Sequence, residues 1–188
     1  MEKIIQENSK EKKPNKFNWN ELLENIKTMI VTAIITILFL TYVAQLAVVC
    51  GESMADTLHD TNIVLVEKIT KRTKHGYQRY DVVVFETENP QKPYYIKRVM
   101  GVPGERIYIQ DSNIFVNDFQ IQDPYKREPF FDRGDRTSEF TLPENNFFVM
   151  GDNRNNSLDG RYKEIGDVDE SIIVGRVLFG LMPIKKVY

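Results

Sequence analysis

Ser53 is the first serine after a long apolar segment, in the sequence Cys50-Gly51-Glu52-Ser53-Met54-Ala55-Asp56-Thr57-Leu58. A serine hydroxyl is a weak nucleophile and needs a neighbouring base to remove its proton. The pattern Gly-x-Ser-x-Ala is close to a nucleophile elbow, but that elbow needs a strand, a sharp turn and a helix of a larger α/β fold. Ser53 is therefore a candidate nucleophile if the chain supplies a base, and otherwise an ordinary surface residue.

The two histidines of the chain are poor candidates for that base. His59 follows Ser53 closely, and His75 lies in a charged loop, Lys71–Arg79. A Ser-His-Asp triad has little support, and we expect both histidines to be solvated surface residues. Two histidines are also too few for most metal sites, so the sequence predicts neither a metal nor a cofactor.

A lysine kept neutral by burial is the other way to activate a serine, and Lys97 is placed to do this. In the predicted strand Tyr94–Met100, Lys97 shares one face with Tyr95 and Val99, while the next residue, Arg98, lies on the opposite face. If the Lys97 face is buried, desolvation lowers the pKa of the ammonium toward neutrality. A lysine that reaches solvent from an edge strand remains the alternative.

A third segment combines a hydrophobic strand with a polar loop, in the sequence from Phe147 to Arg161. The loop, Gly-Asp-Asn-Arg-Asn-Asn-Ser-Leu-Asp-Gly-Arg from Gly151, holds two Asp, two Arg and three Asn. Such a density of hydrogen-bonding groups is compatible with a structural cluster around a site and also with a solvated Asn/Asp turn.

The elements that must position these residues begin with an apolar segment, Thr28–Gly51, which has no charged residue. As a helix it would span about 36 Å, enough for a hydrocarbon core of about 30 Å. A cleaved secretory signal fits less well, because Gln45 and Tyr42 occupy the positions where a cleavage site needs small residues. A buried core helix fits less well too, because no partner helices follow.

Lysine residues predict the orientation of this membrane helix. Near the helix, Lys68 is the one basic residue on the C-terminal side, whereas the N-terminal side has five: Lys10, Lys12, Lys13, Lys16 and Lys27. This bias predicts a cytoplasmic tail at 1–27, a transmembrane helix at 28–51 and an extracytoplasmic domain at 52–188. The protein is thus expected to be a single-pass protein of the cell membrane.

After Gly51 the sequence predicts short strands separated by Gly, Pro, Asn and Asp turns, with no long helical period. The fold class is therefore mainly β, with an antiparallel β-domain after one transmembrane helix. The predicted strands are Asn62–Lys68, Asp81–Glu86, Tyr94–Met100, Arg106–Ile109, Ile114–Val116, Glu139–Leu142, Phe147–Met150 and Ile172–Leu181.

Composition excludes several other classes of protein. The 188 residues include 25 Lys plus Arg and 27 Asp plus Glu, so no nucleic-acid partner is expected. A hydrophobic share of 41% is too high for a disordered chain. Cys50 is the one cysteine, which excludes an intramolecular disulfide and a Cys-rich zinc site. We expect Cys50 to be a small apolar residue at the outer end of the membrane helix.

Together, the three segments resemble the bacterial type I signal peptidases, membrane-anchored Ser-Lys endopeptidases that remove signal peptides from exported proteins. The resemblance is carried by Gly51–Met54, by the Lys-Arg strand with Gly-x-Pro-Gly at Lys97–Gly104, and by Gly151–Arg161. The small size and the single N-terminal helix are similar to the Gram-positive form of the family. The resemblance implies a β-domain of coiled antiparallel sheets.

Carried over to this sequence, the resemblance implies that Ser53 is the nucleophile and Lys97 the general base. It implies that Ser157 is a hydroxyl that orients the lysine amine. It assigns charge pairing around the site to four residues, Arg98, Asp152, Asp159 and Arg161.

Three positions depart from the family pattern. Gly51 stands where some members have a Ser or Thr whose side chain helps to bind the oxyanion, so that a second donor must come from elsewhere. Asp56 stands where the family usually has Pro, and Gly160 where it usually has Ser. Neither change removes the Ser-Lys pair, and Asp56 adds a carboxylate that could alter the pKa of Lys97 or substrate preference.

The short distance in sequence between the apolar segment and Ser53 predicts a nucleophile at the outer membrane surface, where the cleavage site of a signal peptide emerges. The expected partners are the signal peptides of secreted precursors and the lipid bilayer. The strand Asp81–Glu86 is expected to border the pockets for small substrate side chains. A membrane-tethered β-domain that is catalytically silent, and acts as a binding or assembly module, remains the alternative.

Overall fold

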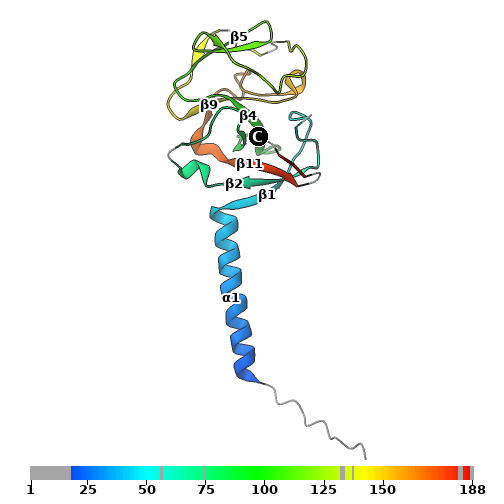
Figure 1. Ribbon diagram of the computed structural model, residues 1–188, viewed down its shortest axis with the longest axis vertical. Coiled ribbons are helices and arrows are strands. Elements are labelled where there is room, and N and C mark those ends of the chain that lie inside the picture. Colours follow the sequence, from blue (N-terminus) through cyan, green and yellow to red (C-terminus); the bar gives the residue numbers. More distant parts are fainter. Residues whose placement is uncertain are drawn as a thin grey trace, which may run out of the picture. The chain divides into compact units, whose positions relative to one another are not determined.

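The computed structural model describes residues 18–55, 57–73, 75–131, 134–136, 138–181 and 184–186. The chain divides into two units, Met1–Leu38 and Phe39–Tyr188. The first unit contains most of one helix, and the second contains all the described strands (Figure 1). The predicted fold class, a mainly β protein with antiparallel sheets and one N-terminal apolar helix, is confirmed.

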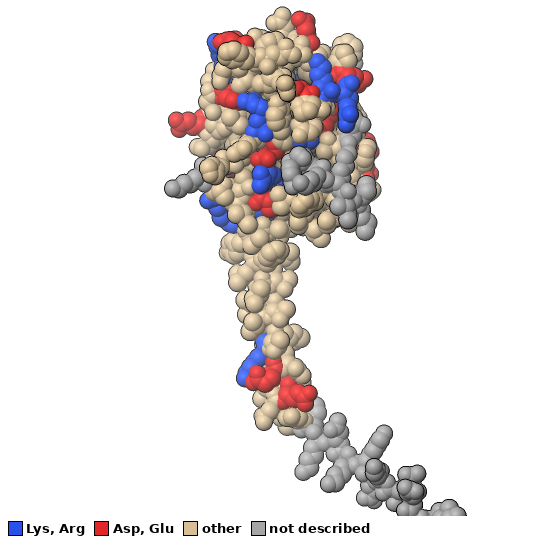
Figure 2. Space-filling model, in the orientation of Figure 1, with Lys and Arg blue, Asp and Glu red and all other residues tan. Residues whose placement is uncertain are grey.

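The helix α1 comprises Trp19–Tyr42. It begins after Asn18, whose Oδ1 accepts a hydrogen bond from the Glu21 N–H at 3.4 Å and so satisfies one of the unpaired donors of the first turn. None of its residues is buried, and it is long and apolar enough to cross a membrane. Figure 2 shows the charged residues near the start of the helix and the uncharged surface that follows them.

The helix begins and ends earlier in the chain than the predicted span, 28–51. Ala44–Val48 forms strand β1, which pairs antiparallel with β2, Ile63–Glu67. An uncharged run has the same composition whether it continues a helix or pairs as a strand, so the composition of the segment could not locate this boundary. Cys50 therefore follows β1 and is exposed, which corrects the expectation that it ends the helix.

The larger sheet has eight strands in the order β1-β2-β11-β3-β4-β9-β10, with β12 also paired to β11. All these pairings are antiparallel. Besides β1 and β2, the strands are β3 (Val82–Glu86), β4 (Tyr94–Gly101), β9 (Asn146–Met150), β10 (Val168–Asp169), β11 (Ile173–Leu181) and β12 (Ile184–Lys186).

A second sheet of four strands, in the order β7-β6-β5-β8, forms a separate layer of the β-domain (Figure 1). All eight strands predicted after Gly51 are present within a residue or two of their predicted bounds. The strands of this sheet are β5 (Arg106–Gln110), β6 (Asn113–Val116), β7 (Phe119–Gln120) and β8 (Phe140–Thr141).

Irregular pairing bends the larger sheet. The register shifts between Ile173 and Gly175 and between Val177 and Phe179 in β11, and again between Val99 and Gly101 in β4. Such bulges increase the local twist of a strand, which accounts for a coiled sheet in place of a flat one.

The middle of β4 is buried on both faces, because β4 lies between β3 and β9 in a sheet with apolar clusters on either side. Ile96 packs against a cluster that includes Val82 and Val84, whereas Val99 belongs to a second cluster with Val83 and Phe85. This strand carries Lys97 and Arg98, so both side chains are forced out of water.

Candidate active site

Ser53 lies in a turn that two buried side chains fix to the β-domain. Met54 and Leu58 are each 1% exposed and belong to one apolar cluster, while the Leu58 N–H donates to Met54 O at 2.8 Å. Burial of these neighbours holds the turn in place, and Ser53 itself stays partly exposed. The serine is therefore accessible on a fixed backbone, as a nucleophile requires.

Lys97 meets Ser53 across the turn. The Lys97 Nζ lies 2.7 Å from Ser53 Oγ, and Lys97 is 3% exposed. On the neighbouring strand β3, Val83 is paired with Lys97, and the ammonium lies 5.2 Å from the centre of the Tyr95 ring. The structure thus brings together the two residues that the sequence predicted as nucleophile and base.

Burial sets the protonation of this lysine. Desolvation lowers the pKa of Lys97 from 10.5 to about 8, although the carboxylates of Asp159 and Asp152 act in the opposite direction. An amine with a pKa near 8 is neutral in a useful fraction of molecules at neutral pH. It can then accept a proton from a hydroxyl at hydrogen-bonding distance, which an ordinary lysine ammonium cannot.

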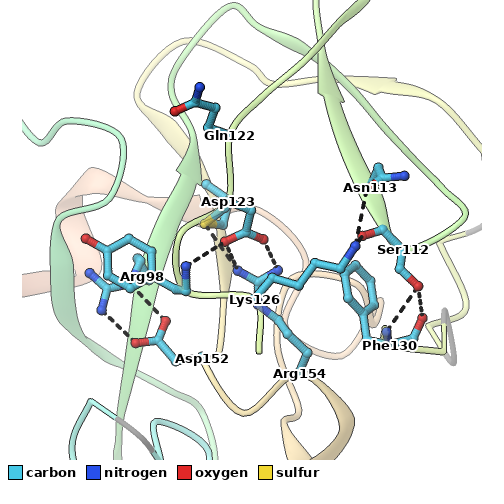
Figure 3. Close-up of polar contacts among 12 residues, drawn as sticks. Arg98, Ser112, Asn113, Gln122, Asp123, Lys126, Phe130, Asp152 and Arg154 are labelled. Atoms are coloured by element: carbon cyan, nitrogen blue, oxygen red, sulfur yellow. Dashed lines mark hydrogen bonds and ion pairs between the residues drawn. The ribbon is translucent and has the colours of Figure 1, made fainter. Parts of the chain in front are cut away.

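Arg98 and Asp152 form a buried ion pair (Figure 3). Arg98 Nε donates to Asp152 Oδ1 at 2.8 Å and Nη2 to Oδ2 at 2.6 Å. The guanidinium also donates to Tyr80 O at 2.7 Å and stacks 3.4 Å from the centre of the Tyr125 ring. Because Arg98 is fully buried, these contacts replace its hydration.

Asp159 and Arg161 form a second buried pair. Arg161 Nε donates to Asp159 Oδ1 at 2.8 Å, and the other carboxylate oxygen accepts from the Gly151 N–H at 2.9 Å. The predicted charge pairing of the four residues Arg98, Asp152, Asp159 and Arg161 is thus present as two separate ion pairs.

Gly151 donates to Asp159 of this pair, and its backbone also lies close to the turn that holds Ser53. A Cβ at Gly151 would lie 2.2 Å from Ser157 Oγ and 2.5 Å from Ser53 O. Ser157 Oγ is buried and has no hydrogen-bond partner among the described residues, so the expected contact with the Lys97 amine is not formed in this structure. The role of Ser157 in orienting the amine stays a prediction.

Asn153 is a site residue that sequence reasoning missed. Its backbone N–H donates to Ser53 O at 3.1 Å, and its side-chain Nδ2 donates to Glu52 O at 3.0 Å. These two hydrogen bonds fix the carbonyl of Ser53 and the carbonyl of the preceding residue, Glu52. Its place in the polar loop indicated hydrogen bonding, but nothing in the sequence indicated the partner.

A buried pair between Arg154 and Asp123 was also missed. Arg154 Nη2 donates to Asp123 Oδ1 at 2.8 Å, and Nη1 pairs with the other carboxylate oxygen (Figure 3). Arg161 Nη2 in turn donates to Arg154 O at 2.6 Å. The irregular loop that holds Asp123 had no pattern that pointed to this contact.

The three departures from the family pattern have different outcomes. The Gly51 N–H donates to Asp60 Oδ1 at 2.7 Å, and Gly51 offers no side chain for an oxyanion. A Cβ at Gly160 would lie 2.8 Å from both Phe148 Cδ2 and Val149 O, so this backbone has no room for a serine there without a shift. Asp56 lies outside the described residues.

Both histidines are exposed, as expected from the sequence. His59 Nδ1 lies 3.9 Å from Glu52 Oε2, and in the described part of the chain the side-chain hydrogen bond of Ser53 is the one to Lys97. The arrangement therefore places a lysine, and not a histidine, within reach of a serine hydroxyl, as a serine hydrolase with a lysine base would require.

Comparison with known proteins agrees with this class. The model of the family described as "Signal peptidase, peptidase S26" matches residues 22–182. Signal peptidase I P of Bacillus subtilis subsp. natto is 32% identical over 185 residues, which cover 95% of each chain. Signal peptidase I U of Bacillus subtilis strain 168 is 34% identical over 163 residues, which cover 80% of this chain and 84% of that protein.

The chain therefore belongs to the signal peptidase family, peptidase S26. This confirms the resemblance found from the three sequence motifs. A solved structure, that of a signal peptidase I from Enterococcus faecalis V583, is 29% identical with a TM-score of 0.44, covering 53% of this chain and 95% of that one.

Proposed function

We propose that this protein is a membrane-bound serine endopeptidase that cleaves signal peptides from exported precursors by a Ser53–Lys97 dyad. The observation that carries the proposal is the 2.7 Å separation between Lys97 Nζ and Ser53 Oγ, with the lysine removed from water. Membership of the signal peptidase family supports the substrate class. Metal and cofactor play no part in the proposed reaction.

In the proposed reaction, neutral Lys97 takes the Ser53 proton as the hydroxyl oxygen attacks the scissile carbonyl carbon. The tetrahedral intermediate collapses, the C–N bond breaks, and the Lys97 ammonium returns its proton to the departing amine. Water then attacks the ester carbonyl carbon while Lys97 takes a proton from it, the C–O bond to Ser53 breaks, and Lys97 returns that proton to Ser53 Oγ as the acid product leaves. The Ser53 backbone N–H is the proposed first donor to the oxyanion.

The two buried ion pairs are proposed to support the dyad without contacting the substrate. Asp152 and Asp159 raise the pKa of Lys97, and the charge of Arg161 lowers it. Pairing with Arg98 and Arg161 therefore limits how far the two carboxylates hold the amine protonated. Ser157 is proposed to complete the shell around the amine.

Partly buried apolar residues that pack against the nucleophile turn are proposed to suit small substrate side chains. Ala47, Ile96 and Val174 are partly buried and pack against the cluster that contains Met54, the residue after the nucleophile. A half-buried apolar surface offers shallow contacts, which favours small residues before the scissile bond. Strand β3 contributes Val82 and Val84 beneath this surface.

The membrane topology is proposed from the lysine bias around the helix, with the N-terminal tail cytoplasmic and the β-domain outside. Because α1 ends at Tyr42, a strand and a turn separate Ser53 from the helix. Ser53 is therefore farther along the chain from the helix than the sequence predicted, and its closeness to the apolar segment gives less support to a nucleophile at the membrane surface. We still propose that the site acts at the outer surface of the membrane, where signal peptides emerge.

The test is cleavage of an exported precursor by the pure full-length protein in detergent. We expect Ser53→Ala and Lys97→Ala each to lower kcat/KM by roughly a thousandfold or more, because each removes one member of the dyad. Lys163→Ala changes an exposed lysine and is the matched control. Mass spectrometry of the products locates the cut, and thermal unfolding checks that each variant folds.

Two outcomes would overturn the proposal in different ways. Retained cleavage by folded Lys97→Ala would exclude lysine as the base. A folded wild type that binds precursor and does not cleave it would favour the alternative, a silent membrane-tethered module.

A further inference from the structure

Three basic side chains gather beside the residues that end the helix. Lys68 Nζ donates to Leu40 O at 3.2 Å and to Thr41 O at 3.4 Å. Arg72 Nη1 donates to Tyr42 O at 2.7 Å, and its guanidinium lies 5.5 Å from the centre of the Tyr42 ring. The last turn of α1 has no basic residue of its own, so Lys68 and Arg72 supply the positive charge that its carbonyls favour.

Lys71 completes this group, and we call Lys68, Lys71 and Arg72 the basic cluster. Its ammonium donates to Ser171 O at 2.6 Å and to Ile173 O at 3.1 Å. With Ser171–Val174, the basic cluster lines a hollow of about 480 Å³. The hollow is large enough to hold a phosphate group with its neighbouring polar atoms.

Among the residues that the structure describes, no ion pair neutralises the charges of the basic cluster. None of its three side chains has a carboxylate oxygen within 4.0 Å in the part of the chain that the structure describes. Glu86 lines the same hollow, and Asp169 senses the charge of Lys71, which contributes to the lowered pKa of that carboxyl after its hydrogen bonds to Ser171. Backbone carbonyls carry only partial charges, so the hollow retains an excess of cationic groups.

The residues around the basic cluster are of the types that are favoured at a membrane interface. Ile69 is 48% exposed and Ile172 is 39% exposed, and Ile172 lines the hollow. Tyr42, which contacts Arg72, is 53% exposed, and tyrosine is favoured at the boundary between hydrocarbon and headgroups. Cations beside exposed apolar side chains match a lipid, whose phosphate and acyl chains are joined.

We propose that the basic cluster binds the anionic headgroups of bilayer lipids and so holds the β-domain against the membrane at the end of the helix. The proposal depends on α1 being a membrane helix and is independent of the Ser53–Lys97 reaction. Each basic residue near an anionic surface contributes about a fivefold gain in association.

The test uses the full-length protein in detergent micelles, titrated with phosphatidylglycerol or with zwitterionic phosphatidylcholine. Native mass spectrometry counts the lipids that remain bound. We expect phosphatidylglycerol to bind more tightly, and Lys71→Gln with Arg72→Gln to weaken it by about 25-fold. Lys163→Gln, a change at an exposed lysine outside the cluster, leaves its binding unchanged.

Glu86→Gln supplies a variant whose effect cannot come from misfolding. Removing the carboxylate of the hollow is expected to tighten phosphatidylglycerol binding by up to about fivefold. Equal binding of the two lipids, or unchanged binding in the double variant, would refute the proposal. Displacement of phosphatidylglycerol by millimolar inorganic phosphate would also refute it, because the site would then recognise free phosphate. Peptidase activity is not a readout here, so this test and that of the dyad fail separately.

Discussion

The protonation of Lys97 predicts a specific pH dependence of cleavage. If neutral Lys97 is the base, kcat/KM follows the fraction of free enzyme in which this amine is deprotonated. Burial lowers the pKa from 10.5 to about 8. At pH 7 the neutral fraction is then roughly one in ten, against about one in three thousand for an unperturbed lysine, a gain of about 300-fold.

The assay is kcat/KM for one precursor in detergent between about pH 5.5 and 10.5. We expect a tenfold rise per pH unit below about pH 8 and a plateau above it. Asp159→Asn removes a carboxylate that raises the pKa of Lys97, so the rising limb should move to lower pH. Lys92→Gln removes an exposed cation that lowers this pKa, so the limb should move slightly the other way.

Opposite shifts in these two variants would be hard to obtain from a general loss of structure. The reasoning would be refuted if the wild-type rate kept rising to pH 10, because Lys97 would then titrate as an ordinary lysine. It would also be refuted if both variants moved the limb in the same direction. Lys163→Gln, which removes the charge of an exposed lysine, serves as the control.

Two further predictions concern the nucleophile turn and the topology. Gly151→Ala places a Cβ against Ser157 Oγ and Ser53 O. We expect the free energy of unfolding to fall by about 1–3 kcal/mol and kcat/KM to fall about 100-fold. Wild-type values in denaturant unfolding and cleavage assays would contradict the tight contact. Cys50, exposed and the one cysteine, should react with a membrane-impermeant maleimide in intact cells, and labelling only after permeabilisation would reverse the proposed orientation.

The strands of the β-domain were the most predictable part of the fold. Alternating apolar residues and turn residues located every predicted strand, because a half-buried strand imposes a period of two on its side chains. The strands that were missed after residue 52, β7, β10 and β12, have two or three residues each and cannot show such a period.

The end of the helix was not predictable in the same way. Ala44–Val48 continues the apolar run of the helix, and its five residues form a strand because Ile63–Glu67 is available to pair with them. This pairing depends on residues far along the chain, whereas the absence of charge is a local property. The prediction therefore placed Ser53 closer to the membrane helix than it is.

The sequence predicted that Ser53 and Lys97 act together, and their side chains lie within hydrogen-bonding distance, but the burial of the residues around Lys97 was not predictable. Alternation placed Lys97 with Tyr95, and the structure shows the ammonium over that ring. Alternation could not show that Arg98, on the other face, would be buried as well. The buried Arg98 side chain is accommodated by Asp152, from the loop that follows β9, and by Tyr125, from an irregular loop. These two residues are brought together only when the chain folds.

Burial of Lys97, which the proposed chemistry requires, lowers the stability of the fold. Its folded-state pKa of about 8 lies below the unfolded value of 10.5, so the unfolded chain binds more protons between these two pH values. Stability therefore rises with pH across this window, and below about pH 8 the lysine costs the fold roughly 3 kcal/mol.

The ion pairs of Asp152 and Asp159 allow burial to lower the pKa of Lys97. Unpaired charges on Asp152 and Asp159 would raise the pKa of Lys97 and cancel much of the effect of desolvation. Arg98 and Arg161 each neutralise one of them through two hydrogen bonds. We infer that the two arginines limit this effect of the carboxylates, so that a larger fraction of the Lys97 amine is neutral at pH 7.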